Sequence, residues 1–144
     1  MADTSVQLEV EDWVRRRWLP LKFGQKFSRE RMRLSSGGLF DFDAVSEDER
    51  IVVVISTSAS KTASGKRGVG KMMKIRSDLY FLLLSNAEKR VIVFTQPDMN
   101  EQFERELKAG RVPRDIEYLL ADIPDELKER LEAARRKASE EAGS

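Results

Sequence analysis

The feature that most constrains the fold is the stretch at residues 51–55 (IVVVI), in which five apolar, β-branched residues follow one another. Such side chains favour extended backbone, and an apolar run without alternation is typical of a strand buried on both faces. Small polar residues follow at 56–64, and a glycine- and lysine-rich segment follows at 65–71. We therefore expect a central strand that opens into a flexible, positively charged loop.

Length and composition bound the chemistry that is available. The chain has 144 residues, a net charge of +1, and neither cysteine nor histidine. Disulfides, thiolate metal sites and Ser-His-Asp triads are thereby excluded. We expect a single domain over 1–144, with a core at about 5–122 and a C-terminal helix and tail at 124–144. No secretion signal or membrane-length apolar run is evident, which favours a cytoplasmic protein with no membrane partner.

Apolar periodicity and turn residues predict the order of helices and strands. Helices are expected at 5–18, from 68 or 69 to 84, at 97–107, and from 124 onward. Strands are expected in the second half of 22–35 and at 39–45, 51–55, 91–95 and 116–120. Pro20 should end the first helix, because its ring prevents continuation. This order predicts an α/β (α+β) fold with a mixed sheet: an αβββαβ core with three antiparallel strands, one right-handed crossover and extra C-terminal helices.

Two of these segments have patterns that assign side chains to faces. At 39–45, strict alternation places Phe40, Phe42 and Ala44 on one face and Leu39, Asp41, Asp43 and Val45 on the other. In the helix at 69–84, the pattern is carried by Val69, Met72, Met73, Arg76, Leu79, Tyr80 and Leu83.

The element order over about 5–95, with acids on the hairpin before a central strand, resembles the PD-(D/E)xK, or restriction-endonuclease-like, nuclease superfamily. That resemblance implies a magnesium-dependent phosphodiesterase acting on nucleic acid such as DNA. In that family an acid on the second strand and an acid-x-lysine on the third hold Mg²⁺ and position the attacking water. Asp41 and Asp43 match the first acid and are the expected metal ligands and catalytic residues.

The third strand departs from the family motif. With a tight turn near Asp48, Asp41 should pair with Ser56 and Asp43 with Val54. The acid-x-lysine position then reads VIS at 54–56 or STS at 56–58, and neither register supplies an acid or a lysine.

Residues elsewhere in the chain are the candidates to fill these missing roles. Lys61, Lys71 or Lys74 is a candidate for the lysine, and Glu9 or Glu11 for an acid. Asp78 is expected to lie too far along its helix. The sequence thus indicates a site that has either migrated or lost its metal chemistry.

The loop after the central strand carries the expected phosphate contacts, because hydroxyls and cations gather there beside a helix N-terminus. These contacts are Ser56, Ser58, Lys61, Lys66, Arg67 and Lys71. The same segment matches the start of a nucleotide phosphate loop, from Gly65 to Gly70 and Lys71. Met72, however, stands where such a loop needs a hydroxyl for magnesium.

The leading hypothesis is a phosphate- or nucleic-acid-binding domain of nuclease-like fold, with magnesium as its cofactor if it retains catalysis. Two alternatives stand beside it. One is a non-catalytic interaction or accessory module, acting as a homodimer or with a protein partner. The other is a nucleotide-binding protein that uses the loop at 65–71.

Overall fold

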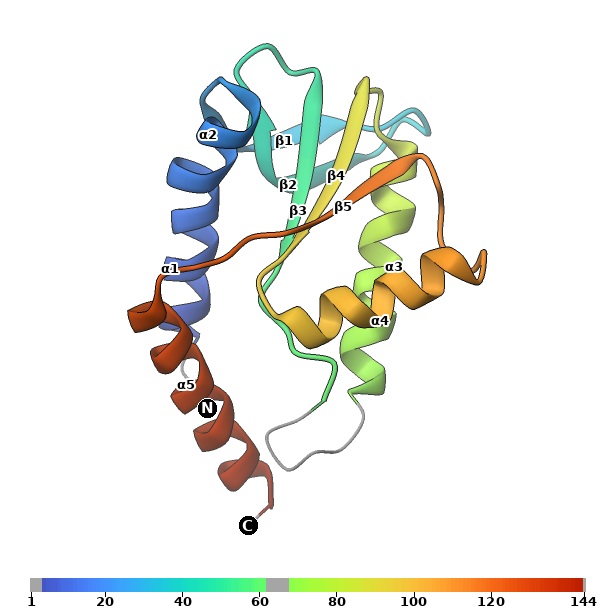
Figure 1. Ribbon diagram of the computed structural model, residues 1–144. Helices are drawn as coiled ribbons and strands as arrows, with labels where there is room; N and C mark the ends of the chain where they lie inside the picture. The colour runs from blue at the N-terminus through green and yellow to red at the C-terminus, as the bar shows by residue number, and fades with distance from the viewer. Residues whose placement is uncertain (1–3, 62–67, 144) are drawn as a thin grey trace.

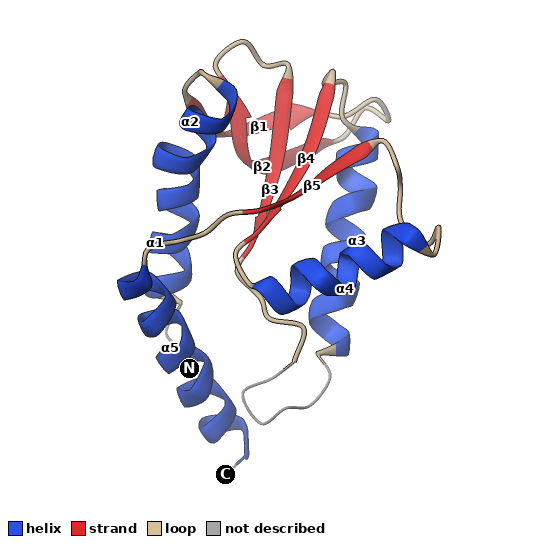
Figure 2. Cartoon of the chain, in the orientation of Figure 1, coloured by secondary structure: helices blue, strands red, loops and turns tan. Residues whose placement is uncertain are grey.

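The computed structural model describes residues 4–61 and 68–143, which form a five-stranded mixed sheet with helices on both faces (Figures 1 and 2). The strands lie in the order of the chain: β1 (Phe27–Arg33), β2 (Leu39–Ser46), β3 (Ile51–Ser56), β4 (Lys89–Phe94) and β5 (Ile116–Leu120). The helical segments are α1 (Ser5–Trp13), the π-helical η1 (Val14–Trp18), α2 (Leu19–Phe23), α3 (Val69–Leu84), α4 (Pro97–Lys108) and α5 (Asp125–Gly143). The predicted mixed α/β fold class is confirmed.

Strand direction changes once across the sheet. The pairs β1–β2 and β2–β3 are antiparallel, whereas β3–β4 and β4–β5 are parallel. The residues of β3 are all buried, as expected for a strand with a neighbour on each side and helices above and below. The expected edge strand at 116–120 is present, and it adds a second parallel connection, through α4, to the one through α3.

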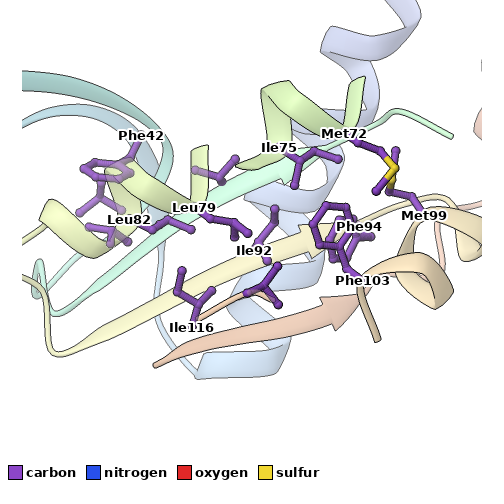
Figure 3. Close-up of a cluster of buried hydrophobic side chains, with 14 of the residues drawn as sticks. Phe42, Met72, Ile75, Leu79, Leu82, Ile92, Phe94, Met99, Phe103 and Ile116 are labelled. Carbon is purple, nitrogen blue, oxygen red and sulfur yellow. The ribbon is translucent and has the colours of Figure 1, made fainter. Parts of the chain in front are cut away.

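A hydrophobic core lies on each face of the sheet. On one face, α3 and α4 cover Val52, Val54, Ile92 and Phe94 (Figure 3). On the other face, α1 and α5 cover Val53, Ile55, Val91 and Val93 (Figure 1). In the described part of the chain, no helix combines the length and the apolar composition that crossing a membrane requires.

The first helix does not end before Pro20, which corrects the predicted boundary at residue 18. Helical backbone continues to Phe23 and stops at Gly24, whose φ of 73° lies in the left-handed region. The wider π-helical turn before the proline lets the Leu19 N–H donate to the Val14 carbonyl, five residues back. Pro20 then occupies the first turn of α2, where the missing N–H costs no hydrogen bond.

A bulge in β2 breaks the predicted alternation. Ser28 pairs with Val45 and Glu30 with Phe42, so two residues of β2, Asp43 and Ala44, lie opposite one residue of β1. Phe42 and Val45 consequently face α3, whereas Ala44 faces α1, so the assignment of Ala44 and Val45 to faces was wrong. The extra residue lies at 43–44, which re-aims Asp43. The predicted register with β3 holds where the two strands pair, at Ala44↔Val53 and Val45↔Val52.

The boundaries predicted for α3 are confirmed, but its predicted stripe divides between two faces. Met72 and Leu79 of the predicted pattern are buried against the sheet, together with Ile75 and Leu82, which the pattern did not include (Figure 3). The other large apolar side chains of the predicted pattern, Val69, Met73, Tyr80 and Leu83, are exposed. The two stripes lie side by side on the helix, so the periodicity did not decide between them.

Candidate functional site

Asp43, at the β2 bulge, joins three elements. Its side-chain Oδ2 accepts a hydrogen bond of 2.8 Å from the backbone N–H of Ile55 in β3. Its backbone carbonyl accepts a 2.6 Å bond from Nε of Arg15, in the π-helical segment η1. The carboxylate therefore accepts the Ile55 N–H just beyond the paired residues of β2 and β3, which are Ala44↔Val53 and Val45↔Val52.

Two further carboxylates lie within electrostatic range of Asp43: Glu11 of α1 and Asp78 of α3. Burial raises the pKa of all three above their ordinary values. The negative charge of Asp43 adds to this for Glu11 and for Asp78. We call Glu11, Asp43 and Asp78 the carboxylate cluster. Burial and mutual repulsion make each of its members harder to ionise than a free side chain.

Three cations surround the carboxylate cluster and partly oppose these shifts. Arg15, Arg29 and Lys74 each act to lower the pKa of Glu11 and of Asp43. Lys74 also places its Nζ 3.2 Å from Oδ2 of Asp78. The side chain of Arg15 is largely buried, whereas Lys74 and Arg29 are exposed. Side chains from α1, η1, β1, β2 and α3 thus form one charge-balanced site.

The site does not fit a ready-made magnesium centre. A divalent cation needs several carboxylate oxygens directed at one point, and no group of three or more acidic side chains in the described ranges is arranged to hold a metal. Asp43 already uses one oxygen on Ile55, and Lys74 lies on Asp78.

The residues predicted as acids fall into different surroundings. Asp41 is exposed, and both of its oxygens are held by Arg31, at 2.9 and 3.3 Å, which lowers its pKa. Asp41 is thus paired with Arg31 of β1, whereas Asp43 interacts electrostatically with Glu11 and Asp78. Asp78, expected to lie too far along its helix, is close enough for Asp43 to shift its pKa. Glu9 is held away from this site by Arg130 of α5, at 2.7 and 2.8 Å.

The lysines predicted for the site also lie in different surroundings. Lys74 joins the carboxylate cluster, whereas Lys71, one turn earlier in α3, lies in the field of Asp98 and Arg135. The pKa of Lys71 is lowered, first by burial and then by Arg135. Lys61 is exposed.

The predicted phosphate loop is described only in part. Ser56 is buried, and its Oγ accepts a 3.4 Å bond from the Ser58 N–H. Ser60 donates from both its N–H and its hydroxyl to Asp98, at 3.1 and 3.0 Å. Lys66 and Arg67 lie outside the described residues, as does Gly65 of the nucleotide-loop pattern. In the part of the loop that the structure describes, the hydroxyls of Ser56 and Ser60 thus bond within the loop and to α4.

Sequence reasoning missed the contributions of Arg15 and Arg29 to this site. Both belong to basic stretches that the sequence displays, at 15–17 and 29–33. At the bulge, the Asp43 carbonyl accepts a bond from Arg15 of η1, and the charges of Arg15 and Arg29 act on the Asp43 carboxylate; alternation alone gave no sign of this arrangement.

Comparison with known proteins adds no family assignment. A scan against protein-family models found no match, and searches of curated proteins and of solved structures found no significant match. The nuclease-like interpretation of this site accordingly rests on element order and on the residues gathered around Asp43.

Proposed function

We propose that this domain binds the phosphodiester backbone of nucleic acid at the surface around the carboxylate cluster. The observation that carries the proposal is the convergence of Arg15, Arg29 and Lys74 on buried carboxylates with raised pKa values. Ionisable groups shifted by burial and by specific charges are enriched at functional sites. Asp43 also has the strand position of the first motif acid in nucleases of the PD-(D/E)xK type, which this domain resembles.

The cations have distinct roles in this proposal. Arg29 and Lys74 are exposed and can each meet a backbone phosphate, which attracts cations without reading sequence. Arg33 adds a further exposed positive charge on the outer strand β1, whereas the charge of Arg31 is paired with Asp41. Arg15 is largely buried and bound to the Asp43 carbonyl, so it positions β2 and is not expected to touch the ligand.

Binding is the conclusion that this geometry supports, because the acid-x-lysine of the third strand is absent and Ile55 occupies the position beside Asp43. Hydrolysis of a phosphodiester by the carboxylate cluster is the outcome that distinguishes a migrated nuclease site from a binding site.

The test is fluorescence anisotropy with labelled single-stranded DNA, duplex DNA and RNA over a range of salt concentrations. Replacing Arg29 or Lys74 by alanine should weaken binding several-fold for all sequences and should reduce the salt slope by about one. Lys108→Ala, at the far end of α4, removes the same charge away from the site and should leave binding unchanged. Absence of salt-sensitive binding at low salt refutes the proposal.

The same protein samples test catalysis. Each is incubated with the three substrates and with Mg²⁺ or Mn²⁺, beside Asp43→Asn. Substrate that stays intact in every sample supports a domain that binds nucleic acid without cleaving it. Cleavage by the wild type that is lost in Asp43→Asn shows that the carboxylate cluster is catalytic and overturns the non-catalytic conclusion.

A further inference from the structure

A row of four aromatic rings leads from the neighbourhood of Asp43 to the surface of α3. Phe42 precedes Asp43 in β2 and is fully buried against α3. Its ring lies 4.8 Å from the ring of Phe40, and Phe40 stacks on Phe81 of α3 at 4.5 Å. Phe81 in turn meets Tyr80 edge to face at 5.7 Å. We call Phe42, Phe40, Phe81 and Tyr80 the aromatic row.

Tyr80 is the exposed end of the aromatic row. It is 59% exposed, whereas every other aromatic residue in the described ranges, 4–61 and 68–143, is buried or half-buried. The stack on Phe40 fixes the ring of Phe81, and the planes of Phe81 and Tyr80 meet at 72°, so Phe81 braces Tyr80 without covering it as a stacked ring would. A ring that is held in place while it stays open loses little conformational freedom when a further planar group stacks on it.

The aromatic row adjoins the proposed phosphate surface on α3 as well as on β2. Asp78, whose Oδ2 lies 3.2 Å from Nζ of Lys74, is followed three residues later by Phe81, on the same side of the helix. Tyr80 lies six residues after Lys74, which is about 9 Å along the helix axis and about a third of a turn around it. The exposed ring and the exposed cation therefore belong to neighbouring parts of one surface, a separation that a short stretch of nucleic acid strand can span.

We propose that the nucleic acid bound at this surface is single-stranded, and that one of its bases stacks on Tyr80 while nearby phosphates contact Lys74 and Arg29. This inference rests on the function proposed above and names the class of nucleic acid. In a duplex the faces of each base are covered by its neighbours in the stack, whereas a base of a single strand can turn outward onto an aromatic side chain. Because every base has a π face, stacking of this kind is tolerant of sequence.

Fluorescence anisotropy with three labelled probes separates the bases from the phosphates. The probes are a single strand about ten nucleotides long, an abasic strand of the same length, and the duplex of the same single strand. The abasic strand keeps the backbone charges and lacks the bases. Wild type should bind the single strand about tenfold more tightly than the abasic strand, and more tightly than the duplex.

Variants at Tyr80 distinguish the ring from the rest of the side chain. Tyr80→Leu should weaken binding of the single strand about tenfold and should leave binding of the abasic strand and of the duplex unchanged. Tyr80→Phe keeps the ring and should bind as wild type does. Arg29→Ala should weaken binding of all three probes, because it acts on the phosphates. Leu120→Ala is the control for loss of an exposed apolar side chain: Leu120 is 40% exposed on β5, at the other edge of the sheet from β1, and its loss should change nothing.

The outcomes separate this inference from the function on which it rests. Salt-sensitive binding of the probes that Tyr80→Leu does not change, or tighter binding of the duplex than of the single strand, overturns the single-strand inference and leaves the phosphate surface standing. A loss in Tyr80→Phe as large as that in Tyr80→Leu also overturns it, because the hydroxyl and not the ring would then make the contact. Absence of binding to every probe at low salt refutes the proposed function and this inference together.

Discussion

Replacing Asp43 by alanine tests whether its carboxylate holds β3 at the β2 bulge. The Oδ2 of Asp43 accepts the Ile55 N–H at 2.8 Å, and Ile55 is 5% exposed. In Asp43→Ala this buried N–H loses its acceptor, because Ile55 lies beyond the residues that pair between β2 and β3. Asp43→Asn keeps a side-chain oxygen at the same place and removes only the charge. The two variants therefore separate the hydrogen bond from the electrostatics.

The magnitudes follow from these contacts. Loss of a buried hydrogen bond to a charged acceptor costs about 1.5–3 kcal/mol. Part of this is offset, since burial raises the pKa of Asp43 and its ionised form is therefore disfavoured in the folded protein. The expected net loss for Asp43→Ala at about pH 7 is about 1–2 kcal/mol. Asp43→Asn should be more stable than Asp43→Ala by about 1 kcal/mol, because the Ile55 N–H keeps an acceptor.

Urea unfolding monitored by circular dichroism measures both variants. With a slope of about 1–3 kcal/mol per molar urea, a loss of 2 kcal/mol lowers the midpoint by about 1 M. Asp41→Ala is the control on the same strand, and it should change the midpoint little because the Asp41–Arg31 pair is exposed. Equal midpoints for Asp43→Ala and Asp43→Asn would refute the role given to the hydrogen bond.

Three further predictions concern other parts of the chain. Glu11→Gln should gain stability relative to wild type as pH rises from about 4 to 7. Because the pKa of Glu11 is raised in the folded protein, folded wild type binds more protons than the unfolded chain in this range, and wild type loses stability as Glu11 ionises. A difference between the unfolding midpoints of the two proteins that does not change with pH contradicts this. Gly24→Ala should lower the free energy of unfolding by about 1 kcal/mol, because the φ of +73° strains an alanine although the surroundings are open. Gly70→Ala, within α3, should raise the free energy of unfolding by up to about 1 kcal/mol, so calorimetry should show opposite shifts of Tm. Phe103→Ala should cost about 3–5 kcal/mol in urea unfolding, because Phe103 is fully buried and stacks on Phe94 at 5.4 Å; a loss below about 1 kcal/mol contradicts that packing.

Local chemistry made the central strand and its register predictable. The unbroken apolar run of β3 needs burial on both faces, and only a strand between neighbours provides that. The register followed from the short charged turn before β3. There Ser46 Oγ accepts the Ile51 N–H at 3.0 Å, and Glu49 adopts a φ of 61°. Both features act within a few residues, which is the range over which sequence determines conformation directly.

The bulge and the exposed face of α3 depend on contacts that a pattern does not contain. Ala44 and Val45 are both apolar, so either can face either core, and packing against α1 and α3 decides between them. In α3, Ile75 and Met73 are equally apolar, and the position of the sheet selects Ile75 for burial. The carboxylate cluster depends on the same bulge, which explains why Asp43 could be identified while its neighbours Arg15 and Arg29 could not.

Two acids of the carboxylate cluster, Glu11 and Asp78, lower the stability of the fold without being required by it. All three acids of the cluster have raised pKa values, so their ionised forms are disfavoured in the folded protein at about pH 7. Asp43 gains a backbone hydrogen bond from Ile55 that opposes the rise of its pKa, whereas in the described part of the chain no backbone N–H does this for Glu11 or Asp78. Neutral residues at these two positions should therefore stabilise the domain, and natural proteins tolerate such costs chiefly where a site needs the groups. If Glu11→Gln and Asp78→Asn stabilise the protein and also change its binding of nucleic acid, the cluster acts on the ligand; stabilisation with unchanged binding assigns the binding to the cations alone.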